Sequence, residues 1–303
     1  MAVTAAMVKE LRSMTGAGMS ACKEVLVEAD GDMKKAEELL RQKGLSAAAK
    51  KAGRIASEGL VDIYIDESSK NGAIVEVNSE TDFVAKNSEF KSYVRNVAIQ
   101  AMNSSAKDLD EFLNEKWQNE DVTVKEALSQ KIAVIGENLN IRRFEKFSTN
   151  GTLISYIHAG GKVGVLLELS CEKNDKVDEL GKNICMQIAA MNPKFVSRSD
   201  VSEEFIAKEK EILTQQAINE GKPANIAEKM ITGRLNKELK EFCLLEQEYV
   251  KDNDLNVGAY IDKVAKELGI EISVKRFVRY ETGEGLAKKE ENFADEVSKA
   301  MGN

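Results

Sequence analysis

The chain has 303 residues, 43% of them hydrophobic, which is enough to bury at least one core and favours two or three domains. Its formal charge of −8 and pI near 5.1 disfavour a general nucleic-acid binder, because phosphate binding needs clustered Lys and Arg. Charged residues stand close to the N-terminus, and no apolar run reaches the roughly 18 residues of a membrane span. We therefore expect a soluble, cytoplasmic protein without membrane contact.

Residues 3–44 predict three short helices. Gly16-Ala17-Gly18 breaks the first helix, and Ser20 is the expected N-cap of the second. Asp30-Gly31-Asp32 then turns the chain into a third helix, which should end at Gly44. This order is typical of a ubiquitin-associated-type helical module.

Residues 1–55 are assigned to this module and its linker, and residues 45–58 should be helical or flexible. Met19 either closes a turn as a core residue or contacts a partner, since methionine adapts to irregular surfaces; the two interpretations are equally supported. The one basic tract is interpreted as a solvated helical face, with weak RNA contact as the lesser alternative. Its members are Lys34, Lys35, Arg41, Lys43, Lys50, Lys51 and Arg54.

The rest of the chain contains an internal duplication. Gly59, Tyr64, Gly72 and Glu76 recur 92 positions later as Gly151, Tyr156, Gly164 and Glu168. Ala101-Met102-Asn103 returns 89 positions later, so the first copy carries three extra residues, around Asp82 and Phe83. Gly136 to Phe144 returns 133 positions later, which requires a net insertion of 44 residues in the second copy, between about 193 and 268. Two copies indicate a duplicated half-domain, since a solenoid needs at least three.

Each copy predicts an antiparallel sheet faced by helices, and together they make an α+β core. The first copy, assigned to 56–148, should contain a hairpin over 60–77, a helix around 90–98, helices over 106–118 and 123–135, and a strand over 139–147. The second copy, assigned to 149–281, should contain strands over 153–157 and 163–169, helices over 176–191 and 257–268, and a strand over 270–280.

The insertion, about 200–247, predicts an antiparallel coiled coil. Its first arm has a narrow apolar seam at a seven-residue spacing, Gly221-Lys222-Pro223 makes the turn, and a second amphipathic helix returns. Arms of some 20 residues would be about 30 Å long. A stalk that stabilises itself and a second contact arm or dimerising surface are equally supported.

Motifs for catalysis are absent from the sequence. There is no phosphate-binding G-x-x-x-x-G-K-[ST] loop, and the glycines at 160, 161 and 164 lack dinucleotide-binding spacing. Four scattered cysteines and one histidine, His158, support neither a zinc site nor a Cys/His pair, so reduced and mostly buried thiols are expected. We expect no cofactor and no metal. His158 should be a surface residue at a hairpin tip, or a partner contact.

Phe83 lies in a polar frame that runs from Ser79 to Ser88. It either packs beneath its own loop, or the loop holds it out as an interface hot spot.

Four motifs stand out along the chain: Thr15 to Met19, Thr81 to Lys86, Ile135 to Arg143, and Gly221-Lys222-Pro223 with Ile226 to Met230. In this order they resemble those of the bacterial elongation factor Ts family, whose members exchange GDP on the GTPase elongation factor Tu. The resemblance spans nearly the whole chain. It implies a helical N-terminal module, a two-part core, a coiled-coil insertion and a C-terminal helical module over 282–303.

The resemblance also implies a partner-binding segment formed by Thr81, Asp82, Phe83 and Val84. Phe83 would enter an apolar crevice between helices of the partner's nucleotide domain, and Asp82 would anchor the loop beside it. This displaces the side chains that hold Mg²⁺ and disturbs the phosphate loop, so GDP leaves faster. The implied partner is elongation factor Tu, both GDP-bound and nucleotide-free, and a homodimer within a larger complex is a further expectation.

Secondary partner contacts are implied for Arg12, Met19 and His158. Ser20-Ala21 and Ala159-Gly160-Gly161 depart from the family pattern, which puts the detail of these contacts in question. Gly283 and Gly285 should release a tail whose helix docks on the GTPase with one face, formed by Phe293, Val297 and Met301.

Two other function classes stay open. A ubiquitin-associated-type adaptor without exchange activity would use residues 3–44 alone, so deleting them would abolish its function while Phe83→Ala did little. A carboxylate enzyme would need a pocket of clustered acids, whereas an exchange factor needs no covalent chemistry of its own.

Overall fold

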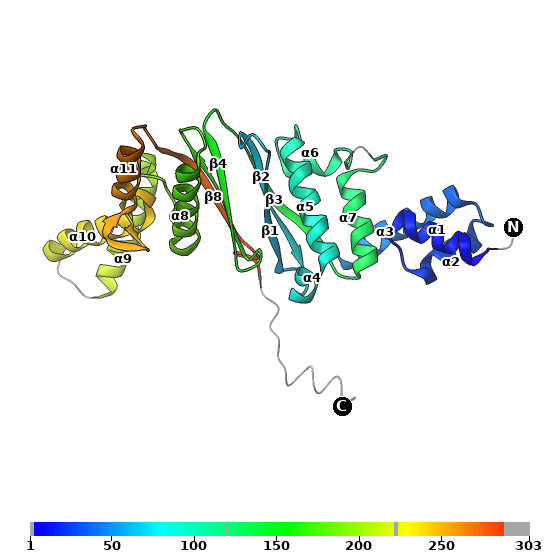
Figure 1. The fold of residues 1–303 in the computed structure, drawn as a ribbon. Coiled ribbons are helices and arrows are strands. Elements are labelled where there is room, and N and C mark those ends of the chain that lie inside the picture. Colours follow the sequence, from blue (N-terminus) through cyan, green and yellow to red (C-terminus); the bar gives the residue numbers. More distant parts are fainter. Residues whose placement is uncertain (1–2, 119, 221–223, 288–303) are drawn as a thin grey trace.

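The computed structural model describes residues 3–118, 120–220 and 224–287. Figure 1 shows a bundle of N-terminal helices at one end, two sheets standing face to face with helices on their outer sides, and a pair of helices at the other end. The expected α+β class is confirmed. Most of the predicted C-terminal module, residues 288–303 with Phe293, Val297 and Met301, and the predicted turn at 221–223 lie outside the described residues.

The N-terminal bundle consists of α1 (Ala5–Thr15), α2 (Met19–Glu28) and α3 (Met33–Lys51). Thr4 caps α1 and Asp32 caps α3 through side-chain oxygens, while the left-handed Gly16 ends α1. The helices enclose a small core of their own, formed by Val8, Leu11, Cys22, Val25, Leu26, Ala29 and Ala36.

Two helix boundaries differ from the prediction. The N-cap of α2 is Gly18, and the predicted cap Ser20 lies inside the helix. Gly44 does not end α3, which continues to Lys51. Gly44 is buried against a later helix, with the Ser129 carbonyl and the Ala133 side chain 3.7 and 3.8 Å from where its Cβ would stand. Its role is to allow close packing, and that contact overrides its weak helix propensity.

The first half of the core is an antiparallel sheet covered on its outer face by helices. The strand order is β1-β2-β3, with β1 Glu58–Ile65, β2 Asn71–Ser79 and β3 Leu139–Ser148. The covering helices are α5 (Ser88–Asn103), α6 (Leu109–Asn114) and α7 (Val124–Ile135). α6 is shorter than the predicted 106–118, because the Trp117 N–H donates to the Val122 carbonyl (2.8 Å) and turns the chain back.

The second half repeats this plan and confirms the duplication. Its sheet has the order β4-β5-β8, with β4 Thr152–His158, β5 Val163–Leu169 and β8 Val274–Glu281. Its covering helices are α8 (Asp175–Met191) and α11 (Val257–Leu268). Both ends of α11 lie 133 positions after those of α7, the offset seen in the sequence. The strand predicted from residue 270 begins only at Val274.

The inner faces of the two sheets pack on each other. Their shared core contains Val61, Ile63, Ile74, Phe147, Leu153, Leu166, Val278 and Tyr280. Larger cores lie between each sheet and its own helices. The result is a sandwich of four layers in the order helices, sheet, sheet, helices, as Figure 1 shows.

The insertion forms a helical pair and a small hairpin. α9 (Glu203–Asn219) and α10 (Ala224–Phe242) run in opposite directions and bury a narrow stripe centred on Leu213, Leu235 and Leu239. The sequence did not predict the two-stranded sheet of β6 (Glu248–Tyr249) and β7 (Asp252–Asn256).

We expect Asp66→Ala to lower the free energy of unfolding by about 1 kcal/mol at neutral pH. Desolvation raises the pKa of Asp66, but hydrogen bonds from Asn71, Ser68 and the Lys70 backbone outweigh it and lower the pKa from 3.8 to about 2. A carboxylate with a depressed folded pKa stabilises the protein above pH 3.8, and this contribution is lost as the pH falls towards 2. Urea denaturation of both proteins from pH 6 to pH 2.5 should therefore show the gap closing; a gap independent of pH would contradict this.

Candidate functional site

The segment with the extra residues forms a short helix, α4 (Asp82–Lys86). Eight residues, 80–87, separate β2 from α5, whereas five, 170–174, separate β5 from α8, so the first half has three more at this position. Thr81 is the N-cap of α4, and its hydroxyl oxygen accepts the Val84 N–H at 3.4 Å. The sequence predicted a loop here, since five residues are too few to reveal a helical period.

Phe83 projects from α4 with 80% of its surface exposed. The interpretation that it packs beneath its own loop is therefore wrong for this structure. Val84 and Ala85 instead face inward and pack against the core of the first sheet. The helix is thus anchored on one side and presents an aromatic ring on the other.

Asp82 and Lys86 close one side of α4 with an ion pair of 2.6 Å. The hydrogen bond from Lys86 holds the pKa of Asp82 below its ordinary value. The Lys86 ammonium also lies 5.9 Å from the centre of the Phe83 ring, at the outer limit of a cation–π contact. Asp82 is therefore ionised at neutral pH beside an exposed ring.

The turn between β4 and β5 reaches the same side of the molecule as α4. The Val61 N–H donates to the Gly161 carbonyl (2.8 Å), Lys162 pairs with Glu58, and the charge of Lys162 contributes to the lowered pKa of Asp82. His158, at the end of β4, is exposed as expected. Its Nδ1 lies 2.9 Å from the Tyr156 hydroxyl on the same strand.

Arg12 and Met19 lie in the N-terminal bundle, where both are exposed. In residues 3–118, 120–220 and 224–287, no hydrogen bond or ring contact joins either of them to α4. Figure 1 shows the bundle at one end of the molecule and α4 beside the first sheet, so the two are separate surfaces.

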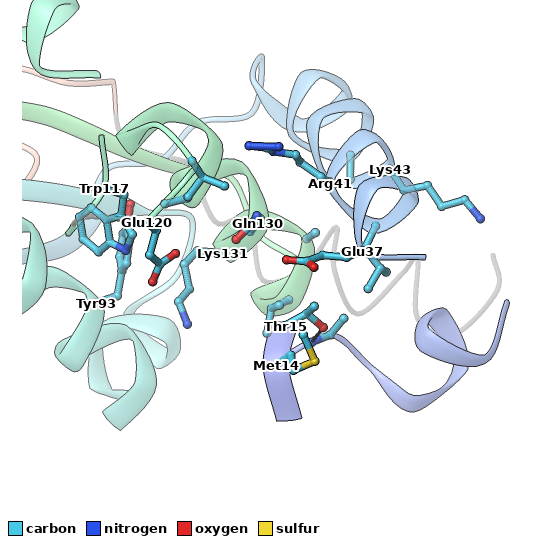
Figure 2. Close-up of a pocket in the computed structure, with 18 of the residues that line it drawn as sticks. Met14, Thr15, Glu37, Arg41, Lys43, Tyr93, Trp117, Glu120, Gln130 and Lys131 are labelled. Carbon is cyan, nitrogen blue, oxygen red and sulfur yellow. Dashed lines mark hydrogen bonds between the residues drawn. The ribbon is translucent and has the colours of Figure 1, made fainter. Parts of the chain in front are cut away.

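A cavity of about 550 Å³ lies between the N-terminal bundle and the first half of the core. Figure 2 shows Met14, Arg41 and Lys43 on the bundle side and Tyr93 and Trp117 on the core side. Burial raises the pKa of the Tyr93 hydroxyl, which has no hydrogen-bond partner among the described residues. Charged side chains around the cavity form ion pairs, such as Lys131 with Glu89 (2.7 Å) and Arg41 with Glu126 (3.4 Å). This cavity lies where α3 packs on α7. Its described lining residues do not form the cluster of acidic side chains that a carboxylate enzyme would need.

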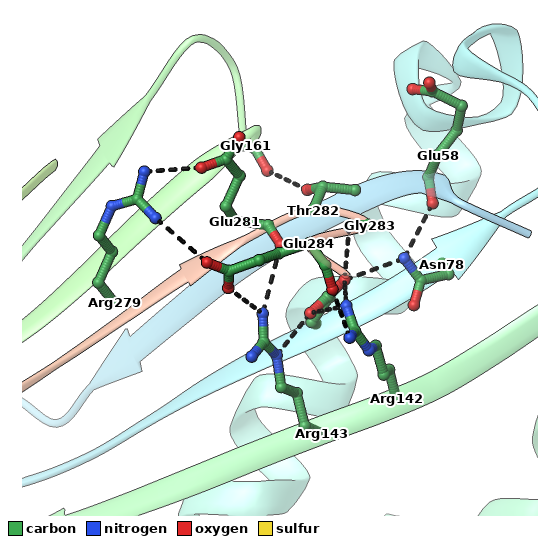
Figure 3. Close-up of polar contacts among 11 residues, drawn as sticks. Glu58, Asn78, Arg142, Arg143, Gly161, Arg279, Glu281, Thr282, Gly283 and Glu284 are labelled. Atoms are coloured by element: carbon green, nitrogen blue, oxygen red, sulfur yellow. Dashed lines mark hydrogen bonds and ion pairs between the residues drawn. The ribbon is translucent and has the colours of Figure 1, made fainter. Parts of the chain in front are cut away.

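Glu76, a fully buried carboxylate on β2, is the centre of a polar cluster between the two halves. It accepts hydrogen bonds from Arg142 (3.0 Å), Arg143 (2.6 Å), the Asn78 amide (3.1 Å) and the Gly283 N–H (2.8 Å). Figure 3 shows that the turn after β8 closes over this cluster. Arg143 also pairs with Glu284, so the cluster contains two carboxylates and two guanidinium groups, and its hydrogen bonds hold the two halves together.

The turn after β8 is fixed up to residue 284, and the tail that Gly283 and Gly285 are predicted to release lies almost entirely outside the described residues. Gly283 itself is held in a left-handed turn (φ 72°), where a Cβ would collide with the Ser57 carbonyl. Glu284 is tied in turn to Arg142 and Arg143. The chain is thus fastened to the first half through residue 284.

Within the described ranges, no group of three or more His, Cys, Asp or Glu side chains could hold a metal ion. The four cysteines are buried and free, as the sequence indicated, and burial raises the pKa of the Cys185 thiol. No helix in the described part of the chain is long and apolar enough to span a membrane.

Glu137, which accepts two hydrogen bonds from Thr81 at the cap of α4, is not among the residues predicted from the sequence. It lies inside one of the four motifs quoted above, but the motif alone assigns it no partner, because Thr81 is 56 positions away.

Comparisons with known proteins agree on one family. The family model described as Elongation factor TS matches residues 80–284, from the residue before the cap of α4 to the turn that covers Glu76. The chain is 56% identical to elongation factor Ts of Clostridioides difficile (strain 630), over 99% of both chains. It is 54% identical to the protein of the same name from Clostridium botulinum (strain Alaska E43 / Type E3), and 53% identical to that from Clostridium perfringens (strain 13 / Type A), again over 99% of each chain.

Proposed function

Because the chain belongs to the elongation factor Ts family, we propose that it is a guanine-nucleotide exchange factor for elongation factor Tu in translation elongation. It acts by binding and performs no covalent chemistry. The observation that carries the proposal is the 80% exposed Phe83 ring on a capped and anchored helix. An aromatic ring left in water at a fixed position is a strong candidate for an interface anchor.

In this mechanism Phe83 enters an apolar crevice between helices of the partner's nucleotide domain. Burying a phenylalanine side chain yields about 1.5–3 kcal/mol, which can be used to separate the partner's helices. Val84 and Ala85 hold α4 against the first core, so the helix itself does not yield. Asp82, which pairs with Lys86, lies next to Phe83 and places a negative charge at the border of the proposed contact.

Separation of those helices withdraws the side chains that support Mg²⁺ in the partner and disturbs its phosphate loop. The diphosphate then loses the main charge that neutralises it, and GDP leaves. Exchange factor and nucleotide weaken each other's binding by the same factor, as linkage requires. The protein must therefore bind both the GDP-bound and the nucleotide-free partner.

Further surfaces support the same complex. We assign the bundle within residues 1–55 as a ubiquitin-associated-like module that offers Arg12 and Met19, and the hairpin tip as the surface that offers His158. Phe293 and Val297, outside the described residues, are proposed contacts of the C-terminal module. The α9–α10 pair is proposed to form a coiled coil that is not part of the exchange surface, and a homodimer within a larger complex stays a prediction.

Stopped-flow release of mant-GDP from purified elongation factor Tu tests the function. The protein should speed release severalfold or more, with a rate that rises with its concentration and then saturates. No acceleration at saturating protein would overturn the proposal. Deletion of residues 3–44 should weaken binding but leave acceleration at high concentration, whereas an adaptor confined to those residues would show no acceleration at all.

A further inference from the structure

Two turns of the first half hold each other through carboxylates beside α4. Glu137, in the turn between α7 and β3, accepts the Thr81 N–H at 3.0 Å and the Thr81 hydroxyl at 2.7 Å. Glu80 accepts the Asn138 N–H in return, at 2.6 Å. In each turn, therefore, one carboxylate accepts a hydrogen bond from a backbone N–H of the other turn. We call Glu80, Thr81, Glu137 and Asn138 the clasp.

The clasp also holds the end of the linker from the N-terminal bundle. The Asn138 side-chain amide donates to the Arg54 carbonyl at 2.8 Å, and the Arg54 guanidinium lies 3.5 Å from Glu80. Asn138 is buried, so its own bonds to Arg54 and Glu80 are largely shielded from water, whereas the Arg54 side chain is 53% exposed. Three segments that are distant in the sequence therefore meet one residue before α4.

Thr81 is fixed through all its polar groups. Its N–H and hydroxyl donate to Glu137, its hydroxyl oxygen accepts the Val84 N–H, and its carbonyl accepts the Ser79 hydroxyl at 2.9 Å. A helix of five residues is not stable by itself, because the entropy lost in forming its first turn exceeds what the few hydrogen bonds of that turn contribute. The direction of α4, and with it that of Phe83, must be set from outside the helix.

The duplication provides an internal comparison. The residue 133 positions after Glu137 is Ile270, which is 39% exposed and cannot accept a hydrogen bond. The second half also has no helix between β5 and α8. The carboxylate is therefore present in the half that carries α4 and absent from the half that lacks it, although the two halves share sheet and helices.

We propose that Glu137 is a positioning residue for nucleotide exchange, which holds the Thr81 cap so that α4 presents Phe83 in one direction. This inference rests on the proposed function. Without Glu137 the remaining surfaces still bring the partner to the protein, but Phe83 is correctly oriented in only a fraction of the complexes. The limiting rate of GDP release falls with that fraction, while the concentration needed for half-maximal effect changes less.

Glu137→Ala tests the proposal through the dependence of mant-GDP release on protein concentration. We expect the limiting rate to fall about tenfold, the effect of losing one charge-assisted hydrogen-bond pair. Amide hydrogen exchange at residues 81–86 should speed up, while the unfolding midpoint changes little, because both hydrogen bonds of Glu137 go to Thr81 at the start of α4 and neither supports a core side chain. Glu137→Gln keeps one acceptor oxygen and should recover part of the rate.

Asp200→Ala is the matched control. Asp200 likewise accepts a backbone N–H (2.8 Å) and a hydroxyl (3.0 Å) from one residue, Ser197, but in the insertion, far from α4 in the sequence. It should leave the limiting rate unchanged. Adding Glu137→Ala to a Phe83→Ala protein should also have no further effect on that rate, since Glu137 acts through the ring.

The outcomes separate the two proposals. If the wild-type protein does not accelerate release, the exchange function fails and this inference fails with it. If the wild type accelerates release and Glu137→Ala matches it, only the positioning role is overturned. A further loss of rate in the double variant, or an equal loss in Asp200→Ala, would overturn it as well, because either result indicates an effect that does not pass through α4.

Discussion

Replacing Phe83 with alanine should lower the accelerated rate of GDP release from elongation factor Tu about thirtyfold or more, the equivalent of a hot spot of about 2 kcal/mol. The ring is 80% exposed, so in the free protein it supports almost nothing and its loss leaves the unfolding midpoint unchanged. The whole effect should thus appear in the exchange reaction. Stopped-flow mant-GDP release, alongside thermal unfolding of the same samples, measures both quantities.

Ile218→Ala provides a control of similar character for Phe83→Ala. Ile218 lies on α9 with 60% of its surface exposed, so the substitution removes an exposed apolar side chain far from α4 in the sequence. It should leave exchange on elongation factor Tu unchanged. Equal acceleration by Phe83→Ala and the wild type would contradict the mechanism but keep the function, and would move the exchange step to other contacts.

Glu76→Ala should lower the free energy of unfolding by about 3 kcal/mol, at the lower end of what is lost when a buried ion pair is broken. Glu76 is fully buried and holds two guanidinium groups and the Gly283 N–H. Its removal leaves Arg142 and Arg143 close together without their shared counter-ion. Urea denaturation measures the loss, and hydrogen exchange at residues 281–286 should speed up at the same time.

The second half contains the control for this experiment. Glu168 occupies the position equivalent to Glu76, and Arg276 the position equivalent to Arg143, with a pair distance of 2.6 Å in both halves. The Glu168 side chain is 13% exposed and that of Arg276 is 47% exposed, so water replaces part of this pair. Glu168→Ala should therefore cost only about 1 kcal/mol. Equal losses for the two variants would show that the burial of Glu76 adds nothing.

The order of strands and helices in the core is predicted well from the sequence, because the duplication of the two halves is visible in the sequence itself. Helix 257–268 and strand 163–169 were placed at their observed bounds, since a repeated pattern combines the evidence of both copies. Gly44 was misjudged because its helix propensity is local, whereas its packing against α7 depends on a partner about 85 residues away.

The candidate site was predictable in its location but not in its geometry. The three extra residues point to the position of Phe83, because an insertion in one of two copies needs a reason. That Phe83 projects while Val84 packs inward depends on α4, which is too short for periodicity to reveal. Glu137 and Gly283 were out of reach for a related reason, because each bonds to a residue far away in the chain.

The bond from Gly283 to Glu76 also orders events during synthesis on the ribosome. Its two residues are 207 positions apart, so at about 5–20 residues per second Glu76 is synthesised roughly 10–40 s before its last donor. Throughout that time Glu76 lacks its full set of partners, because the second sheet that covers this face of β2 is not yet complete. The Gly283 N–H is made only when nearly all of the 303 residues have been synthesised. A ribosome that stalls before Gly283 therefore leaves a product that lacks this hydrogen bond between the two halves and is more readily cut by proteases.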